Sequence, residues 1–536
     1  EALTTYAPRG SWAELHRKLS RIGTVHVENV HLLSNLEPFR YSSPDFIQKS
    51  VQGMHNIYEA NALHLYPQAS YWDYPYTADK TPKRLLQLDR DEMWYKTWAR
   101  YAWNANRDRK GEVIFWDNYL GKKFGVSSTA ANKVLNAYEE TGEIAPKLLR
   151  RYGITDGNRQ TLTLGMLMTQ LINPYRYGLF TMLYESEAPE GEMIIDYAEK
   201  EWKGEKHIGE TPMQIAEEVV VHGKKAFDAI NQVKQVGKNK EEFARLKNDV
   251  YCYYYLANHF SEKVKASLAA LRYKYSNDIQ DLKKALPHLE LSVEQYSQLV
   301  NVTKDRYLYA NSMQTKQRKI PMRGVDATFI HWKEMLPVFQ KELTRFRFVI
   351  DSLEHHTGQK NTVVQYIKPA KVTLLSKVAT TYSLAVGQQA FADTSVKITA
   401  ITPELKDLQG LSFAKEQQIT DGTILEFKTE VPVKLLVGYF NESVGLFSTK
   451  KRQFLQKPEL ETDASANNYG QSEIKISNAL LLGDLPPVNI HTYSFAAGTH
   501  RLTMGKGACL LLGFMDGNQE IKPFDAGLAG NKKNID

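Results

Sequence analysis

The sequence predicts a multidomain α+β protein, and three features of the 536-residue chain lead to this fold class. Two short runs near the N-terminus alternate apolar and polar residues, the middle has helical spacing, and short β-rich runs separated by turns fill the end. The chain is too long for one compact core, so two or three domains are expected. We expect a strand–helix–strand region over 1–79, an α-helical domain over 80–355, a linker over 356–372 and an antiparallel β-sandwich over 373–536.

The N-terminal region contains two predicted strands joined by one helix. Residues 23–33 and 61–66 alternate well enough to form strands, and a helix begins near Pro44 between them. Two parallel strands leave the faces and edges of a sheet uncovered, so further strands upstream of Glu1 are expected. Chemistry in α/β folds collects where parallel strands end. The loops that follow these two strands are therefore expected to carry the functional residues.

The loop after the first strand carries the main candidate for acid–base chemistry. Glu37 follows a strand and precedes Pro38, so its carboxyl group is expected at the working end of the sheet as a general acid or base. Glu28 is the nearest carboxylate in sequence, although its position within the strand fits a buried structural pair as well. His31 and His64 lie in or at the end of the strands. We group them with Glu37 as candidate catalytic residues because they can contact a substrate hydroxyl or carboxylate.

Histidines on these strands also raise the question of a metal. His26, His31 and His64 lie in or next to the predicted strands, but the sequence has neither an H-E-x-x-H nor a C-x-x-C motif. Histidines hydrogen-bonded at strand ends are the favoured interpretation. The glycine-containing segments match no P-loop, dinucleotide or G-x-S-x-G fingerprint. We therefore expect no metal and no cofactor.

Two further segments have residue types that suit sugar binding. Residues 71–76 are rich in aromatic residues and proline, which fits a stacking platform for sugar rings or a wedge between domains. Residues 309–324 are rich in amides and guanidinium groups, which fits either a carboxylate clamp or a solvated loop. The candidate substrate-binding residues are Asn35, Arg40, Tyr71, Trp72, Asp73, Gln314, Arg318 and Arg323.

Helical spacing continues almost without interruption from residue 81 to residue 353. Trp94, Trp98 and Tyr101 stand at i, i+4 and i+7, which predicts one buried aromatic face. The segments fit antiparallel bundle helices joined by modest loops. The predicted helices cover residues 89–103, 113–124, 211–230, 240–273, 292–304 and 329–350.

Short β-rich runs with regular spacing follow from about residue 373, which is typical of an antiparallel sandwich. Asp-Gly pairs at 421–422 and 516–517 supply turn residues. No catalytic constellation is evident there, so accessory packing or glycan contact is expected. The runs are residues 396–402, 424–427, 433–437, 473–476, 491–495 and 509–514.

Composition excludes several classes of protein. The net charge of +7 is spread along the chain without a basic block, which argues against a nucleic-acid partner. Two cysteines are too few for a disulfide framework, and no apolar run is long enough to span a membrane. The 30 tyrosines suit sugar rings and interfaces, although most are expected to fill cores. Because the chain begins at Glu1 rather than Met, a signal peptide or larger upstream segment is expected.

Residues 98–108, which read Trp-Ala-Arg-Tyr-Ala-Trp-Asn-Ala-Asn-Arg-Asp, resemble a segment of the α-glucuronidases of glycoside hydrolase families 67 and 115. In those enzymes an aromatic helix that follows the barrel ends in a similar turn; here Ala105 stands where that turn often has proline. The resemblance implies that residues 1–79 are the terminal strands of a (β/α)8-type (TIM) barrel. It places Glu37 at the end of the penultimate strand and the other catalytic carboxylates upstream of Glu1.

The sequence therefore predicts a secreted or periplasmic, exo-acting glycoside hydrolase that uses carboxylates on a uronate-containing or other complex glycan. Its expected partner is an oligosaccharide or polysaccharide, with no nucleic acid and no membrane span, and a homo-oligomer is left open. One alternative is a polysaccharide lyase that cleaves a uronate-containing glycan, for example a rhamnosyl-glucuronate linkage, by β-elimination. The other is a non-catalytic glycan-binding protein whose sandwich binds the ligand.

Overall fold

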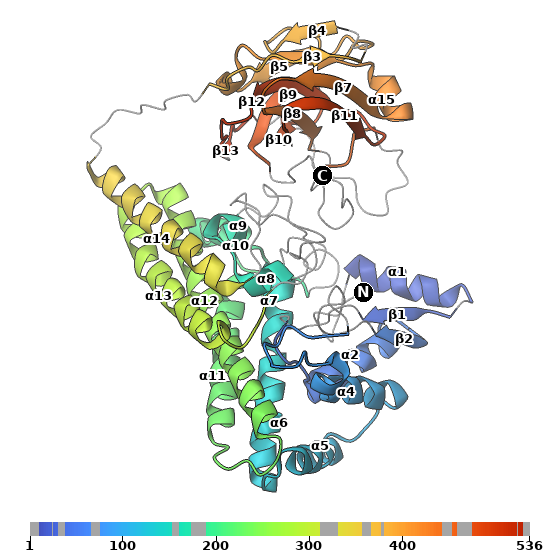
Figure 1. The fold of residues 1–536 in the computed structure, drawn as a ribbon, viewed down its shortest axis with the longest axis vertical. Helices are drawn as coiled ribbons and strands as arrows, with labels where there is room; N and C mark the ends of the chain where they lie inside the picture. Colours follow the sequence, from blue (N-terminus) through green and yellow to red (C-terminus); the bar gives the residue numbers. More distant parts are fainter. Residues whose placement is uncertain are drawn as a thin grey trace. The chain divides into compact units, whose positions relative to one another are not determined.

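The described residues of the computed structural model form two compact units, one within residues 1–357 and one within residues 358–536. Figure 1 shows the two units. The structure describes residues 10–23, 25–30, 38–65, 75–152, 160–172, 189–310, 331–355, 366–376, 380–441, 453–457, 474–522 and 524–528.

The first unit begins with the predicted strand–helix–strand arrangement. Strands β1 (Val27–Val30) and β2 (Ala62–Leu65) pair in parallel, and α2 (Pro44–Asn56) connects them. Helix α1 (Gly10–Arg21) precedes β1. One side of α2, with Phe46, Ile47, Val51 and Met54, is buried as its spacing predicts. The two parallel strands are thus confirmed, while the remainder of a barrel stays a prediction.

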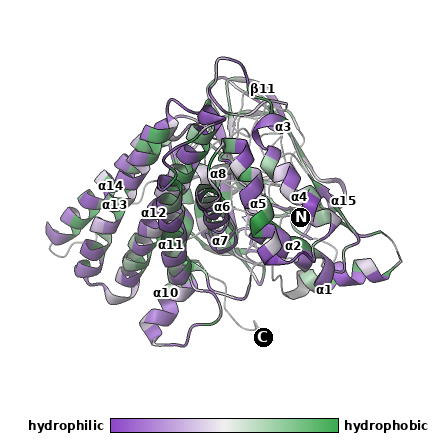
Figure 2. Ribbon diagram, turned by 90° about the horizontal axis from the view of Figure 1, so that it is seen from below, coloured by the Kyte–Doolittle hydropathy of each residue, from purple (hydrophilic) through white to green (hydrophobic). Residues whose placement is uncertain are grey.

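Helices make up the rest of this unit. In Figure 2 the helices α11 to α14 lie side by side and carry both hydrophilic and hydrophobic residues along their length, as bundle helices do. Helix α12 contacts both α11 and α13, and α13 contacts α14. The helices are α3 (Gln87–Arg90), α4 (Glu92–Trp103), α5 (Arg109–Phe124), α6 (Ser128–Gly142), α7 (Ile144–Tyr152), α8 (Gln160–Leu164), α9 (Met168–Ile172), α10 (Ile194–Lys203), α11 (Pro212–Asn231), α12 (Lys240–Ser276), α13 (Ile279–Thr303) and α14 (Trp332–His355).

Local sequence explains several helix boundaries. The Thr211 side chain accepts a hydrogen bond from the backbone N–H of Gln214 at 3.1 Å, and Pro212 occupies the first turn of α11, as expected. Helix α13 differs from the prediction because it begins at Ile279, capped by the Asp278 side chain, and continues through Pro287. Packing against α12 and α14 keeps this helix continuous through the proline, which local propensity alone disfavours.

In its described residues, the second unit consists of β-sheets, the short helix α15 (Lys415–Asp421) and a single 3-10 turn at Pro403–Leu405. The main sheet has the order β13-β9-β10-β8-β12-β6-β4, with β5 paired to β9, and a second sheet has the order β11-β7-β3. Apart from the parallel β13–β9 pair, the strands are antiparallel. They are β3 (Thr373–Leu374), β4 (Thr380–Ser383), β5 (Ile398–Ile401), β6 (Gln409–Ser412), β7 (Thr423–Thr429), β8 (Val433–Phe440), β9 (Ile476–Leu482), β10 (Val488–Phe495), β11 (Gly498–Met504), β12 (Leu510–Asp516) and β13 (Phe524–Asp525).

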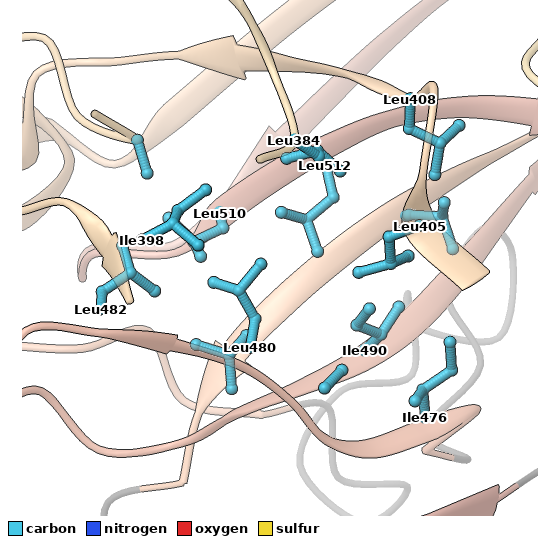
Figure 3. Close-up of a cluster of buried hydrophobic side chains, with 14 of the residues drawn as sticks. Leu384, Ile398, Leu405, Leu408, Ile476, Leu480, Leu482, Ile490, Leu510 and Leu512 are labelled. Carbon is cyan, nitrogen blue, oxygen red and sulfur yellow. The ribbon is translucent and has the colours of Figure 1, made fainter. Parts of the chain in front are cut away.

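The main sheet of this unit is buried on both faces. On β8, Leu435 and Val437 belong to a cluster that also includes residues of the second sheet, whereas Leu436 and Phe440 belong to a separate cluster. Figure 3 shows this separate cluster, in which side chains from β5, β9, β10 and β12 point toward one another. In Figure 1 the main sheet curls. The predicted runs are therefore antiparallel strands, but a simple two-layer sandwich is not confirmed.

The predicted strand at residues 473–476 is displaced, because β9 begins at Ile476 and runs to Leu482. Asn478 within β9 has a positive φ of 47°, and the register of β9 shifts against both of its antiparallel neighbours. This irregularity interrupts the alternation that marks a strand in a sequence.

Among the helices that the structure describes, none is long and apolar enough to cross a membrane.

Candidate active site

The two parallel strands end at the same level, because Val30 and Leu65 are partners in the register of the sheet. The loops that follow therefore start side by side, as expected of a strand-end site. Most of the candidate residues lie in these loops or in 311–330, outside the residues that the structure describes. They are His31, Asn35, Glu37, Tyr71, Trp72, Asp73, Gln314, Arg318 and Arg323. Of the others, His64 is exposed on β2, and Arg40 lies just beyond the first loop.

Arg40 anchors the point where the first loop returns to the described part of the chain. Its Nε and Nη2 atoms donate to Glu242 at 2.7 and 2.9 Å, and Nη1 donates to Asp249 at 3.0 Å. Nη2 also donates to Asp79 at 3.0 Å, and the backbone N–H of Arg40 donates to Asp249 at 2.9 Å. The side chain is 3% exposed. This position fits anchoring the loop rather than the predicted contact with substrate.

The second loop returns to the same place. Asp79, which follows it, accepts hydrogen bonds from Arg40 and forms a further ion pair with Arg90 at 2.7 Å. Arg90 also donates to the backbone carbonyl of Pro38, immediately after the first loop, and to Asp91 at 2.9 Å. Buried guanidinium groups therefore join the ends of both loops to each other. Charge-assisted hydrogen bonds of this kind are stronger than neutral ones.

The third segment, 311–330, also starts and ends here. Before it, the Tyr307 hydroxyl donates to Asp249, and the backbone N–H of Leu308 donates to the carbonyl of Ala78 at 2.8 Å. After it, the ring of Trp332 stacks on Phe39 with centroids 5.2 Å apart and planes 9° apart. The three segments that carry the candidate residues thus share their anchor points, although they are far apart in sequence.

We call these anchor residues the loop-root cluster. It consists of Phe39, Arg40, Asp79, Arg90, Asp91, Glu242, Arg245, Asp249, Tyr307 and Trp332. The cluster joins the strand–helix–strand region to helix α12 of the bundle, which supplies Glu242, Arg245 and Asp249. Residues on both sides of the predicted 79/80 boundary consequently belong to one compact unit.

Electrostatics fix the charge states in this cluster. Burial would raise the pKa of Asp79, but Arg90 and Arg40 outweigh it and hold this pKa far below its usual range. Burial would lower the pKa of Arg40, but Asp79, Glu242 and Asp249 hold it well above its usual range. The carboxylate of Asp79 therefore stays ionised and bound to guanidinium groups. Such a group is a poor general acid, because its proton is absent at the pH of catalysis.

Asp249 and Asp91 differ from Asp79, since burial raises the pKa of both against the lowering effect of their arginine partners. Asp249 accepts hydrogen bonds from Arg40 and Tyr307, so its oxygens are committed within the cluster. We assign these acids the role of positioning the loops. The sequence contained a signal for Asp249, because it lies on the apolar stripe of α12 between Leu246 and Tyr253, where a carboxylate needs a buried partner.

Glu28 forms a buried structural pair and does not lie beside the loops. It is 1% exposed, and its carboxylate lies 3.2 Å from the ring of His16 on α1. Of the three histidines singled out from the sequence, His31 lies outside the described residues. His26 approaches His16 and Glu28, while His64 is on the neighbouring strand.

No protein-family model matches the sequence, and no curated protein matches it. Among solved structures, the chain is similar to one described as a GH138 enzyme targeting pectin rhamnogalacturonan II, with 47% identity and a TM-score of 0.90. The match covers 98% of this chain and 60% of that one, so the chain spans about three fifths of the length of its relative. This comparison finds family 138 rather than the α-glucuronidase families 67 and 115. Over nearly all of its length, the chain is thus similar to a glycoside hydrolase of family 138.

Proposed function

We propose that this chain works as a glycoside hydrolase on a complex pectic glycan. The observation that carries the proposal is the 47% identity over 98% of the chain to an enzyme that targets pectin rhamnogalacturonan II. The convergence of three candidate loops on the loop-root cluster supports it independently. Rigid anchoring of loops that carry functional groups is what a hydrolase needs to hold its catalytic acids in place.

In the proposed mechanism, Glu37 supplies one of the two carboxyl groups of glycoside hydrolysis. It lies between the end of β1 and Arg40, so both ends of its short loop are held by the fold. Asp79 and Asp249 are poor candidates for its partner, since Arg40 and Arg90 occupy the oxygens of Asp79, and Arg40 and Tyr307 occupy those of Asp249. We expect the second carboxylate to lie outside the described residues.

We further propose that the sugar recognised is a uronate. Arg318 or Arg323 would bind its carboxylate bidentately, and Trp72 and Asp73 would contact its ring and hydroxyls. The loop of Trp72 and Asp73 ends at the loop-root cluster, and segment 311–330 begins and ends there, which supports a shared binding surface. The α-glucuronidase-like specificity remains a prediction. A secreted or periplasmic location is proposed because a large pectic polymer is an extracellular substrate.

Activity on rhamnogalacturonan II oligosaccharides tests this proposal. The protein, assayed together with any residues that precede Glu1 in it, should release sugar with a new reducing end. Glu37→Gln should lower turnover by about 10²-fold or more, since acid–base catalysis contributes this much. Glu14→Gln is the matched control, because Glu14 is an exposed partner of Lys18 and should not affect turnover. Products with the ultraviolet absorbance of an unsaturated uronate would indicate a lyase instead. Glycan binding without turnover would indicate a non-catalytic binding protein.

A further inference from the structure

A cluster of three potential metal ligands lies within the strand–helix–strand region and has no part in the roles assigned above. His16 projects from α1, His26 immediately precedes β1, and Glu28 lies within β1. One possible ligand atom of each side chain lies close to those of the other two. His16 Nδ1 lies 2.9 Å from His26 Nε2 and 3.2 Å from Glu28 Oε2. His26 Nε2 lies 3.7 Å from the same Glu28 oxygen. The side chains of all three are nearly or fully buried.

These three separations match the edges of a zinc coordination polyhedron. Zinc binds imidazole nitrogen and carboxylate oxygen at about 2.0–2.2 Å, so two ligand atoms at the tetrahedral angle stand about 3.3–3.5 Å apart. The distances of 2.9, 3.2 and 3.7 Å bracket this value, and only shifts of a few tenths of an ångström separate them from it. Two imidazoles and one carboxylate are also a donor set that divalent transition metals favour.

The surroundings of His26 resemble the outer shell of a metal ligand. Ser20 Oγ lies within hydrogen-bond distance of His26 Nδ1, at 2.5 Å, and also donates to the backbone carbonyl of Tyr58 at 3.2 Å. Because the Ser20 hydroxyl donates its proton to the Tyr58 carbonyl, its oxygen can accept a hydrogen bond from Nδ1–H of His26. Nε2 of His26 then carries the lone pair, which points toward the cluster. A second hydrogen bond of this kind is the usual way in which proteins orient a ligating histidine.

His16 is oriented as well. Its ring stacks on Tyr58, with centroids 4.3 Å apart and planes 14° apart. The backbone N–H of His26 donates to the Asn61 side chain at 3.1 Å, which fixes the start of β1 beside β2. The stacking on Tyr58 orients the ring of His16, and Ser20 orients the ring of His26, so that their nitrogen atoms meet at the shared point. A single ion there would tie α1 to the sheet.

We propose that His16, His26 and Glu28 form a zinc site, with water in the fourth position. The site is structural, because its ligands come from the packed layer between α1 and β1 and not from the loops that follow the strands. The inference is independent of the glycoside hydrolase proposal, since it rests on the geometry of these three residues alone.

Zinc titration of the full chain tests this proposal. After treatment with a chelator, isothermal titration with zinc chloride should give about one site per chain. Glu28→Gln and His16→Gln should each weaken binding by more than about 100-fold, and Ser20→Ala by about 10–100-fold through the orientation of His26. His55→Gln is the matched control, because His55 is an exposed histidine on α2 and should leave binding unchanged.

A second measurement guards against variants that fold poorly. Cobalt(II) bound in place of zinc should give the intense visible absorption of a tetrahedral site in the wild-type chain, and this band should be lost in Glu28→Gln while the helical circular dichroism is retained. The absence of a zinc site in the wild-type chain would overturn the proposal. Unchanged binding in both Glu28→Gln and His16→Gln would overturn it too, since the metal would then sit at other surface histidines.

Discussion

Replacing Arg40 tests whether the loop-root cluster holds the first unit together. Arg40→Met removes a guanidinium that makes four side-chain hydrogen bonds to three carboxylates, two of which are almost completely buried. Removing one partner of a buried ion pair costs about 3–5 kcal/mol, because the remaining charge is left without compensation. The free energy of unfolding of this unit should therefore fall by about 3–5 kcal/mol. The free energy of unfolding of Arg40→Lys should lie between those of the wild-type chain and Arg40→Met, since an ammonium group keeps the charge but loses the bidentate geometry.

The assay is urea unfolding followed by far-ultraviolet circular dichroism, whose helical signal reports on the first unit. Arg21→Met is the matched control, because Arg21 makes a similar pair of hydrogen bonds to Glu59 in an exposed position. Its loss should cost far less than the loss of Arg40, because solvent screens an exposed ion pair. Adding Asp249→Asn to Arg40→Met should restore part of the loss, since it removes one uncompensated carboxylate. A cost for Arg40→Met no larger than that for Arg21→Met would refute the reasoning.

Three further predictions concern packing, pH and reactivity. Gly142→Ala should destabilise the first unit by about 1–3 kcal/mol, because the new Cβ atom would lie 2.2 Å from Cβ of Ser43, and thermal unfolding should show a lower midpoint. Burial, and then the charge of nearby Lys263, lower the pKa of His259. Below the ordinary pKa of histidine, the unfolded chain therefore binds a proton at this residue that the folded chain does not bind. The free energy of unfolding consequently decreases as the pH falls. His259→Gln should reduce the loss of stability between about pH 7.5 and about 5.5 by about 1.4 kcal/mol, measured by urea unfolding at both pH values. Cys252 and Cys509 are buried with raised pKa values, so a thiol reagent should modify neither until the chain is unfolded.

Features with local causes were predictable from the sequence. The two strands and the helix between them follow from alternation and a proline at the helix start, and the buried face of Trp94, Trp98 and Tyr101 follows from its spacing. Strand β11 was missed, although its burial alternates, because His500 and Arg501 interrupt an apolar pattern. Helix α15 was missed because its short sequence is polar.

The loop-root cluster could not be predicted, because its members are distant in sequence. Arg40 and Asp249 are separated by more than 200 positions. The position of Asp249 on an apolar helix face indicates a buried partner, but it does not say which residue that partner is. Only the packing of α12 against the strand–helix–strand region brings them together. The pairing of His16 with Glu28 was hidden for the same reason, since a helix and a strand contribute one residue each.

The most direct test of the proposed active site is hydrogen–deuterium exchange of the Glu37→Gln variant with and without a rhamnogalacturonan II oligosaccharide. If the loop-root cluster gathers three loops around one substrate, the ligand should slow exchange in residues 31–37, 66–74 and 311–330 together. Protection in only one of these segments, or protection confined to residues 373–536, would contradict the account.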